Sequence, residues 1–113
     1  MHEMMLCESI LKILEEEAAL QHFERVTKVH LELGVLAHIS PESMLFCFDA
    51  VTRGTLAEEA TLEISRPPGE AWCETCARCV TITRRGQACP ACGNYRFKLT
   101  AGEEMKISAL EVE

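Results

Sequence analysis

The sequence predicts an α+β protein, in which a small three-stranded sheet with two helices carries an inserted zinc-ribbon-like module with four cysteines. Three observations predict this class. Apolar residues recur at helical spacing in two segments, they alternate with polar residues in three others, and two Cys-x-x-Cys pairs precede the last alternating segment. Because three short strands cannot bury both of their faces, we expect the helices to cover at least one face.

The first two elements are an amphipathic helix and a half-buried strand. Residues 4–22 form the predicted helix, and its apolar positions recur at helical spacing: Leu6, Ile10, Ile13, Leu14 and Ala18. Residues 26–33 alternate between apolar and polar side chains and end at Gly34, which is typical of a strand with one buried face.

The second helix begins at Ser40-Pro41-Glu42, because serine is a good N-cap and proline is favoured in the first turn. It presents Leu45, Phe48, Val51 and Thr52 on one face and ends at Gly54. Alternation over residues 60–66 predicts a second strand, and residues 105–112 predict the last one.

The domain organisation follows from Pro67-Pro68-Gly69, which breaks the strand pattern, and from Ala101-Gly102, which ends the cysteine-containing stretch. The sequence therefore predicts a discontinuous core domain made of residues 1–66 and 102–113. Residues 67–101 form the predicted zinc-binding domain. The two breaks could let this domain move relative to the core, in response to metal binding or pH.

Two Cys-x-x-Cys pairs carry the strongest chemical signal. Cys73 and Cys76 are followed, twelve residues later, by Cys89 and Cys92. Each pair forms a tight turn that points two sulfurs at one ion, so the two turns complete a tetrahedral thiolate site for zinc. Four protein ligands leave no open position, so we expect a structural ion, no hydrolysis at the zinc, and a protein that is not an enzyme.

Three alternatives remain open at this site. Cys79 makes a second Cys-x-x-Cys pair with Cys76, but the stretch from residue 79 reads as a strand, so Cys73 and Cys76 are preferred as ligands. The thiols could instead form a redox dithiol or stay free and buried, and iron could replace zinc.

Cys7 and Cys47 lie on the predicted helices, where we expect them to be small buried residues.

Cysteine usage and the amino-terminal sequence predict a cytoplasmic protein. The chain has seven cysteines, an odd number, and four of them fall into the paired motif. The first residues are not a basic start followed by an apolar run, and no stretch approaches the roughly 18 apolar residues that span a bilayer. We therefore expect no membrane association.

The charge is unevenly distributed. The chain carries a formal net charge of −7, yet residues 67–100 hold Glu70 and Glu74 against five basic residues: Arg78, Arg84, Arg85, Arg96 and Lys98. This stretch is therefore +3 and the remainder −10. The negative total repels phosphate backbones, so nucleic acid is not the expected partner. The basic stretch nevertheless favours one alternative function, a zinc-ribbon adaptor that binds nucleic acid or transcription machinery.

His2 predicts a second metal site. A histidine directly after a free amino terminus offers the terminal amine, its own amide nitrogen and its imidazole, and such planar nitrogen coordination suits Ni²⁺ or Cu²⁺. A fourth donor could come from Glu3, from solvent, or from one of the other histidines, which are His22, His30 and His38. Binding should weaken as pH falls, because the amine must lose its proton.

Several short motifs together resemble the HypA/HybF family of nickel metallochaperones. They are Met1-His2-Glu3, Leu6-Cys7, Arg25-Val26-Thr27, Phe46-Cys47-Phe48-Asp49, Trp72-Cys73-Glu74-Thr75-Cys76, and Cys89-Pro90 with Cys92. The resemblance spans essentially the whole chain in order. It implies that nickel binds at Met1 (through its amine), His2 and Glu3, and that zinc binds at the four paired cysteines.

The resemblance also implies a function. The protein would hold Ni²⁺ as transient cargo and deliver it to a hydrogenase large-subunit precursor during maturation of [NiFe] hydrogenase. A GTPase of the same maturation pathway would be a second partner. A monomer or a weak homodimer is expected.

Overall fold

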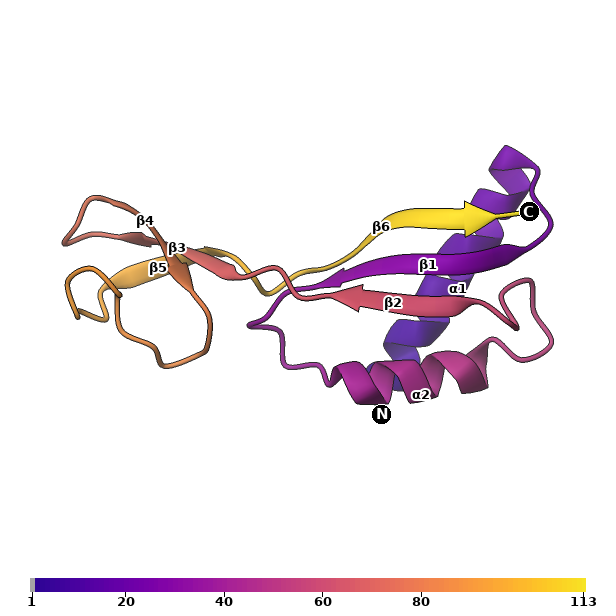
Figure 1. The fold of residues 1–113 in the computed structure, drawn as a ribbon, viewed down its shortest axis with the longest axis horizontal. Coiled ribbons are helices and arrows are strands. Elements are labelled where there is room, and N and C mark those ends of the chain that lie inside the picture. The colour runs from indigo at the N-terminus through magenta and orange to yellow at the C-terminus, as the bar shows by residue number, and fades with distance from the viewer. Residues whose placement is uncertain (1) are drawn as a thin grey trace. The chain divides into compact units, whose positions relative to one another are not determined.

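A computed structural model describes residues 2–113 of the chain (Figure 1). Its elements, in order, are α1 (His2–Gln21), β1 (Val26–Leu33), α2 (Pro41–Val51), β2 (Thr61–Ser65), β3 (Gly69–Cys73), β4 (Arg78–Ile82), β5 (Phe97–Ala101) and β6 (Met105–Val112). The predicted α+β class, with two helices and a small three-stranded sheet, is confirmed. The cysteine-rich stretch contains a second sheet of its own, of which the sequence predicted only the strand starting at residue 79.

The chain folds into two compact units. The first comprises the residues up to Leu31, Ile39–Ile64 and Ile107–Glu113, and the second comprises Glu32–His38 and Ser65–Lys106. The second unit therefore includes a short segment, residues 32–38, that precedes the second helix. The predicted domain boundaries, 1–66 with 102–113 and 67–101, stay a prediction.

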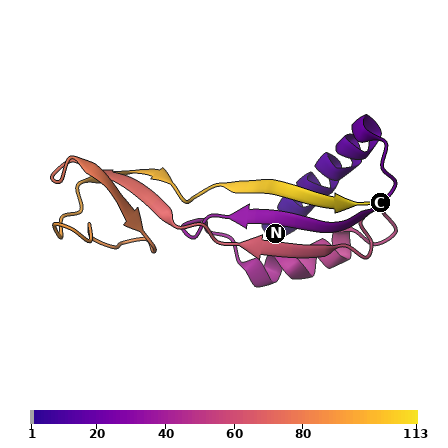
Figure 2. The ribbon, with the colours of Figure 1, turned by 45° about the horizontal axis from the view of Figure 1, so that its top comes forward.

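The first unit is a sheet with both helices on one face. Its strands run in the order β2-β1-β6, and Figures 1 and 2 show α1 and α2 on the same side of this sheet. The central strand β1 buries alternate apolar residues, among them Val29 and Leu31, beneath the helices. The opposite face keeps polar side chains such as Lys28 and Glu63, which form an ion pair at 3.3 Å.

The buried faces of both helices differ in part from those that the sequence predicted. In α1 the fully buried residues are Cys7, Ile10 and Leu14, which lie three and four positions apart on one line of the helix surface. Ile13 was assigned to this face, yet it is 44% exposed because it lies beside that line. In α2, Phe48 is buried as predicted, but Leu45, which was assigned to the same face, is 47% exposed. The buried face turns instead toward Met44 and Cys47.

The predicted start of α2 is confirmed. Ser40 is its N-cap, with an extended backbone, and its hydroxyl oxygen accepts a hydrogen bond from the Ser43 N–H at 3.2 Å. Pro41 opens the helix, where its missing N–H costs nothing. The cap satisfies one of the N–H groups that a helix start leaves without a partner.

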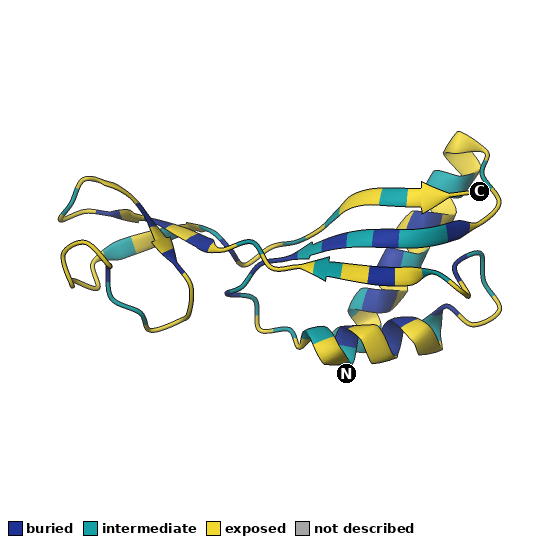
Figure 3. Ribbon diagram, viewed as in Figure 1, coloured by how far each residue is buried: buried dark blue, intermediate teal, exposed yellow. Residues whose placement is uncertain are grey.

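The second unit is an antiparallel sheet in the order β4-β3-β5. Its small core consists of Leu36, Ala71, Cys73, Val80, Ile82 and Cys89. Buried and exposed residues alternate along β3, and Figure 3 colours the strands by this burial. Leu36 comes from the 32–38 segment. The Arg66 guanidinium stabilises this segment by donating hydrogen bonds to the carbonyl oxygens of Leu33 and Gly34 at 2.7 and 3.2 Å. Gly34 is required there, because a Cβ would overlap the backbone of Gly102.

Candidate metal centre

The first cysteine pair sits in a tight turn that follows β3. Cys73 is the last residue of that strand, and the Ala77 N–H donates to the Cys73 carbonyl oxygen at 2.8 Å. Ala77 adopts a left-handed backbone with φ of 55°, which turns the chain after Cys76. The Cys76 N–H lies 3.5 Å from the Cys73 sulfur, so the backbone itself wraps one thiol.

The second pair has the same backbone path. The Gly93 N–H donates to the Cys89 carbonyl oxygen at 2.8 Å, and Gly93 is left-handed with φ of 78°. Glycine adopts this conformation at no steric cost, whereas Ala77 must accept some strain at the matching position. Sequence reasoning could not predict the left-handed turn at Ala77, because alanine gives no signal of this conformation.

The four predicted ligand sulfurs lie together. All ligand atoms of Cys73, Cys76, Cys89 and Cys92 are within 4.8 Å of one another, and the Cys73–Cys92 and Cys76–Cys89 sulfur pairs are 3.6 and 3.9 Å apart. Two sulfurs bound to one tetrahedral ion at about 2.3 Å should be about 3.8 Å apart. These two separations fit a tetrahedral zinc ion, and the cluster as a whole is compact enough to surround one.

Cys79 lies outside this cluster. In the antiparallel register of β3 and β4 it pairs with Trp72, whereas the inward-facing Ala71 pairs with Val80. Cys79 and Trp72 are both exposed, because they occupy the outer face of the sheet. The strand expected from residue 79 is what turns this thiol away from the other four.

The surroundings of the cluster shift the pKa values of Cys76 and Cys89 in opposite directions. Hydrogen bonding to Cys92, then burial, raises the pKa of Cys76 to about 12. Burial alone would raise the pKa of Cys89 as well, but backbone N–H groups of Cys92 and Ala91 stabilise its thiolate and lower its pKa to about 6. A thiolate, the form that binds metal, is therefore favoured at Cys89 near neutral pH.

The predicted nickel residues lie at the start of α1. His2 is its first described residue and is exposed, while Glu3 is half-buried with a carboxylate oxygen 3.5 Å from the Ser40 N–H. Met1 lies outside the described residues. The first N–H groups of a helix have no partner within it, so the amide of His2 is not held by the helix ladder.

The other histidines do not gather into a ligand set. Within residues 2–113, the four cysteines are the only group of three or more Cys, His, Asp or Glu ligand atoms this close together. His30 instead contacts Glu111, with its Nε2 2.9 Å from a carboxylate oxygen.

Cys7 and Cys47 are buried, as predicted, where α1 packs against α2. Burial, with smaller contributions from Cys47 and Glu3, raises the pKa of Cys7 to about 11. Its thiol stays protonated near neutral pH and packs against the Met44 sulfur at 4.0 Å. These two cysteines behave as apolar packing residues.

Fold and site together define a small α+β protein with a four-cysteine cluster that fits a zinc site. The family model of HypA, described as hydrogenase/urease nickel incorporation, metallochaperone, matches residues 1–112. The hydrogenase maturation factors HypA of Rhodopseudomonas palustris and Azotobacter chroococcum are 53% and 55% identical over 113 residues, the full length of each chain. The chain belongs to the HypA family.

Two solved structures share the fold. The solution structure of the Ni metallochaperone HypA from Helicobacter pylori matches with a TM-score of 0.72 and 20% identity, and it covers 97% of this chain and 96% of that chain. A second solution structure, of HypA protein, gives 0.73 and 22%, covering 100% and 97%. Within the described residues, no helix has the length and apolar character that crossing a membrane requires.

Proposed function

We propose that this protein is a nickel metallochaperone that holds Ni²⁺ at Met1, His2 and Glu3 and delivers it during maturation of [NiFe] hydrogenase. The observation that carries the proposal is the match to the HypA family model over residues 1–112. An exposed chelate at the tip of a helix also suits transfer, because a recipient can replace its donors one at a time.

The proposed zinc ion has a different role. Cys73, Cys76, Cys89 and Cys92 would hold Zn²⁺ with no open position, so the ion would supply folding energy to a unit with a small core. The chain then binds and transfers a metal without catalysing a reaction, and it is not an enzyme. Its working partners would be a maturation GTPase and a hydrogenase large-subunit precursor, in the cytoplasm and away from membranes and nucleic acid.

The nickel site is tested on untagged protein with its native amino terminus. We expect His2→Ala, or two extra residues placed before Met1, to weaken Ni²⁺ binding by at least about 10–100-fold, a loss typical even of residues that only support ligands. Calorimetric titration measures the affinity, and elemental analysis should show unchanged zinc in both variants.

His22→Asn is the matched control. His22 is another exposed histidine, and its left-handed backbone, with φ of 60°, is one that asparagine tolerates. It should bind nickel as the unchanged protein does. Full nickel affinity in both His2→Ala and the extended chain would defeat the amino-terminal site.

A further inference from the structure

The second unit contains a small apolar cavity that the metal centre does not use. Its volume is about 90 Å³, and none of the four clustered cysteines lines it. The residues around it are Leu36, Ile82, Arg84, Arg85, Gly86, Phe97 and Leu99. The cavity is therefore a separate feature of the zinc-binding unit.

The walls of the cavity are apolar and only partly covered. Leu36 and Ile82 belong to the buried core of the unit. Phe97 and Leu99 extend inward from β5 but remain half-buried, because the cavity leaves part of each side chain open. An apolar side chain entering here would contact aliphatic and aromatic carbon on several sides, which favours its removal from water.

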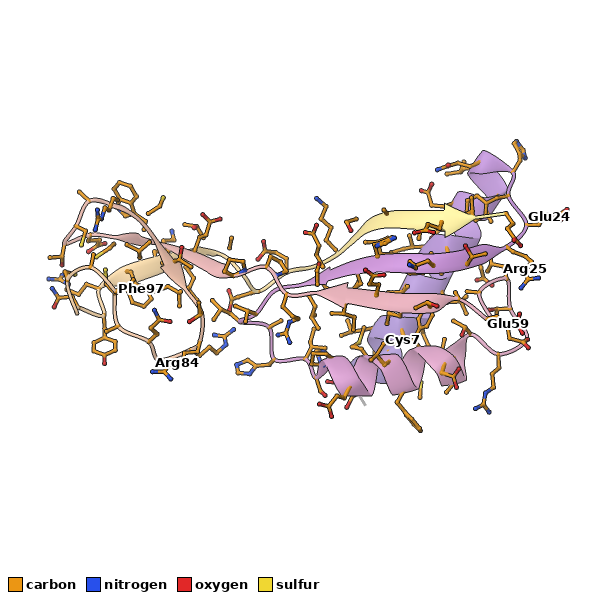
Figure 4. All side chains as sticks on the ribbon, viewed as in Figure 1. Cys7, Glu24, Arg25, Glu59, Arg84 and Phe97 are labelled. Atoms are coloured by element: carbon orange, nitrogen blue, oxygen red, sulfur yellow. The ribbon has the colours of Figure 1, made fainter. Side chains whose placement is uncertain are left out.

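Two arginines border the cavity, and they differ in their partners. Arg85 is fully engaged, since its Nε donates to the Leu36 carbonyl oxygen at 2.9 Å and its guanidinium pairs with Glu103. Arg84, labelled with Phe97 in Figure 4, is exposed, and no ion pair links it to any other residue in the range 2–113. An unengaged guanidinium therefore stands beside an apolar hollow.

We propose that this cavity docks a protein partner that inserts one apolar side chain and places a neighbouring carboxylate on Arg84. The proposal rests on the proposed function, because delivery requires a recipient to dock, and it names the chemistry of that contact. The local charge supports a carboxylate on the partner, since residues 67–100, which include Arg84, carry +3. Aliphatic walls and a negative overall charge favour protein over nucleic acid.

The test uses the full-length, zinc-loaded protein and fluorescein-labelled decapeptides. The first peptide has leucine followed by two aspartates within a glycine-serine background. The second replaces the leucine with serine, and the third replaces the aspartates with lysines. We expect saturable binding of the first peptide by anisotropy, with amide shifts at residues 82–86 and 97–99, and binding at least about tenfold weaker for the other two.

Arg84→Ala should weaken the first peptide about tenfold, and Arg84→Glu should abolish its binding. Lys98→Ala is the matched control, because Lys98 has the same charge on β5 but alternates away from Phe97 and Leu99. It should bind within about twofold of the unchanged protein. Nickel affinity should be unaltered in all three variants, and His2→Ala should bind the peptide normally, which separates this proposal from the nickel site.

Four results would overturn the proposal. They are absence of saturable binding at millimolar peptide, equal losses in Arg84→Ala and Lys98→Ala, displacement of the peptide by a DNA oligonucleotide that shifts the same amides, and concentration-dependent self-association that Arg84→Ala removes. The third result would assign the cavity to nucleic acid, and the fourth would assign it to a second copy of this chain.

Discussion

At the scale of single residues, the assignment of zinc ligands depends on which of two overlapping Cys-x-x-Cys pairs turns inward. The structure places Cys76 within the cluster and Cys79 on the outer face of β4 beside Trp72. We expect Cys79→Ser to retain about one zinc ion per chain and Cys76→Ser to lose zinc or bind it far more weakly, because only the second change removes a thiolate from a tetrahedral site. Elemental analysis and competition with a chromophoric chelator measure this.

Cys79→Ser also serves as the control for the loss of a thiol near the site. If Cys79→Ser lost zinc while Cys76→Ser kept it, Cys79 would replace Cys76 as a zinc ligand and the assignment would be wrong.

A second residue-level prediction concerns pH and the contact between His30 and Glu111. The hydrogen bond from His30, and then the charge of Lys28, hold the pKa of Glu111 below its ordinary value of 4.5. Because the folded pKa is lowered, the stabilisation is complete above the ordinary carboxyl pKa and is lost as pH falls through the folded value. Carbon NMR of the Glu111 carboxyl group should show a midpoint below 4.5 that rises in His30→Ala.

Glu111→Gln gives an independent measure of the same contact. Its free energy of unfolding should fall below that of the unchanged protein near neutral pH, and the two should converge in acid. A Glu111 midpoint unchanged by His30→Ala would contradict the assignment.

At the scale of elements, the segment 32–38 contributes more to the core of the second unit than its sequence implies. Leu36 is 2% exposed within the core that also holds Cys73 and Cys89. We expect Leu36→Ala to destabilise this unit by about 2–5 kcal/mol, the usual cost of truncating a buried leucine. Unfolding of the zinc-loaded protein, followed by amide signals of the second unit, measures the change.

Leu45→Ala is the control for Leu36→Ala. Leu45 is 47% exposed on α2, so its truncation should change stability by no more than about 0.5 kcal/mol. Equal changes in the free energy of unfolding for the two substitutions would show that Leu36 does not stabilise the second unit.

The same segment shows where prediction from sequence ends. Helical spacing, strand alternation, the N-cap at Ser40 and the paired cysteines each follow a local rule, and the structure contains the helices, the strands, the cap and the cysteine cluster that these rules predict. Val35 and Leu36 follow a strand-ending glycine, so nothing local assigns them to a core whose other residues lie more than thirty positions later. Ile13 was misplaced for a related reason, because spacing gives the centre of a helix face more reliably than its width.

The site was predictable to the same extent. The spacing of Cys73, Cys76, Cys89 and Cys92 was enough to predict that they lie together, because each Cys-x-x-Cys turn is local and a tetrahedral ion requires two such turns. The cavity beside Arg84 was not predictable, since it combines side chains from the 32–38 segment, β4 and β5. Met1, the proposed nickel donor, lies outside the described residues, so its role stays a prediction.

At the scale of the whole molecule, the two units differ in what stabilises them. The first has a core shared between a sheet and two helices, whereas the second has the few buried residues grouped around its cysteines. We expect a strong zinc chelator to unfold the second unit and leave the first folded, because metal binding supplies most of the folding energy of a unit this small. Heteronuclear NMR would show amide signals collapsing for residues 69–101 while those of α1 and α2 persist.

Restoring zinc should recover the original spectrum of the second unit. Loss of both sets of signals together on chelation would mean that the first unit does not fold without the second. Persistence of both sets after complete zinc removal would mean that the small core is sufficient by itself.

The matching turns at Cys73–Ala77 and Cys89–Gly93 have a consequence for how the ion is held. Each loop closes with the same type of backbone hydrogen bond and with a left-handed residue at the same position, Ala77 in one and Gly93 in the other. Each loop is therefore a complete local turn that supplies two of the four thiols. It presents these two thiols to an ion without waiting for the other loop, so the proposed zinc site divides into two halves that are each built from local sequence.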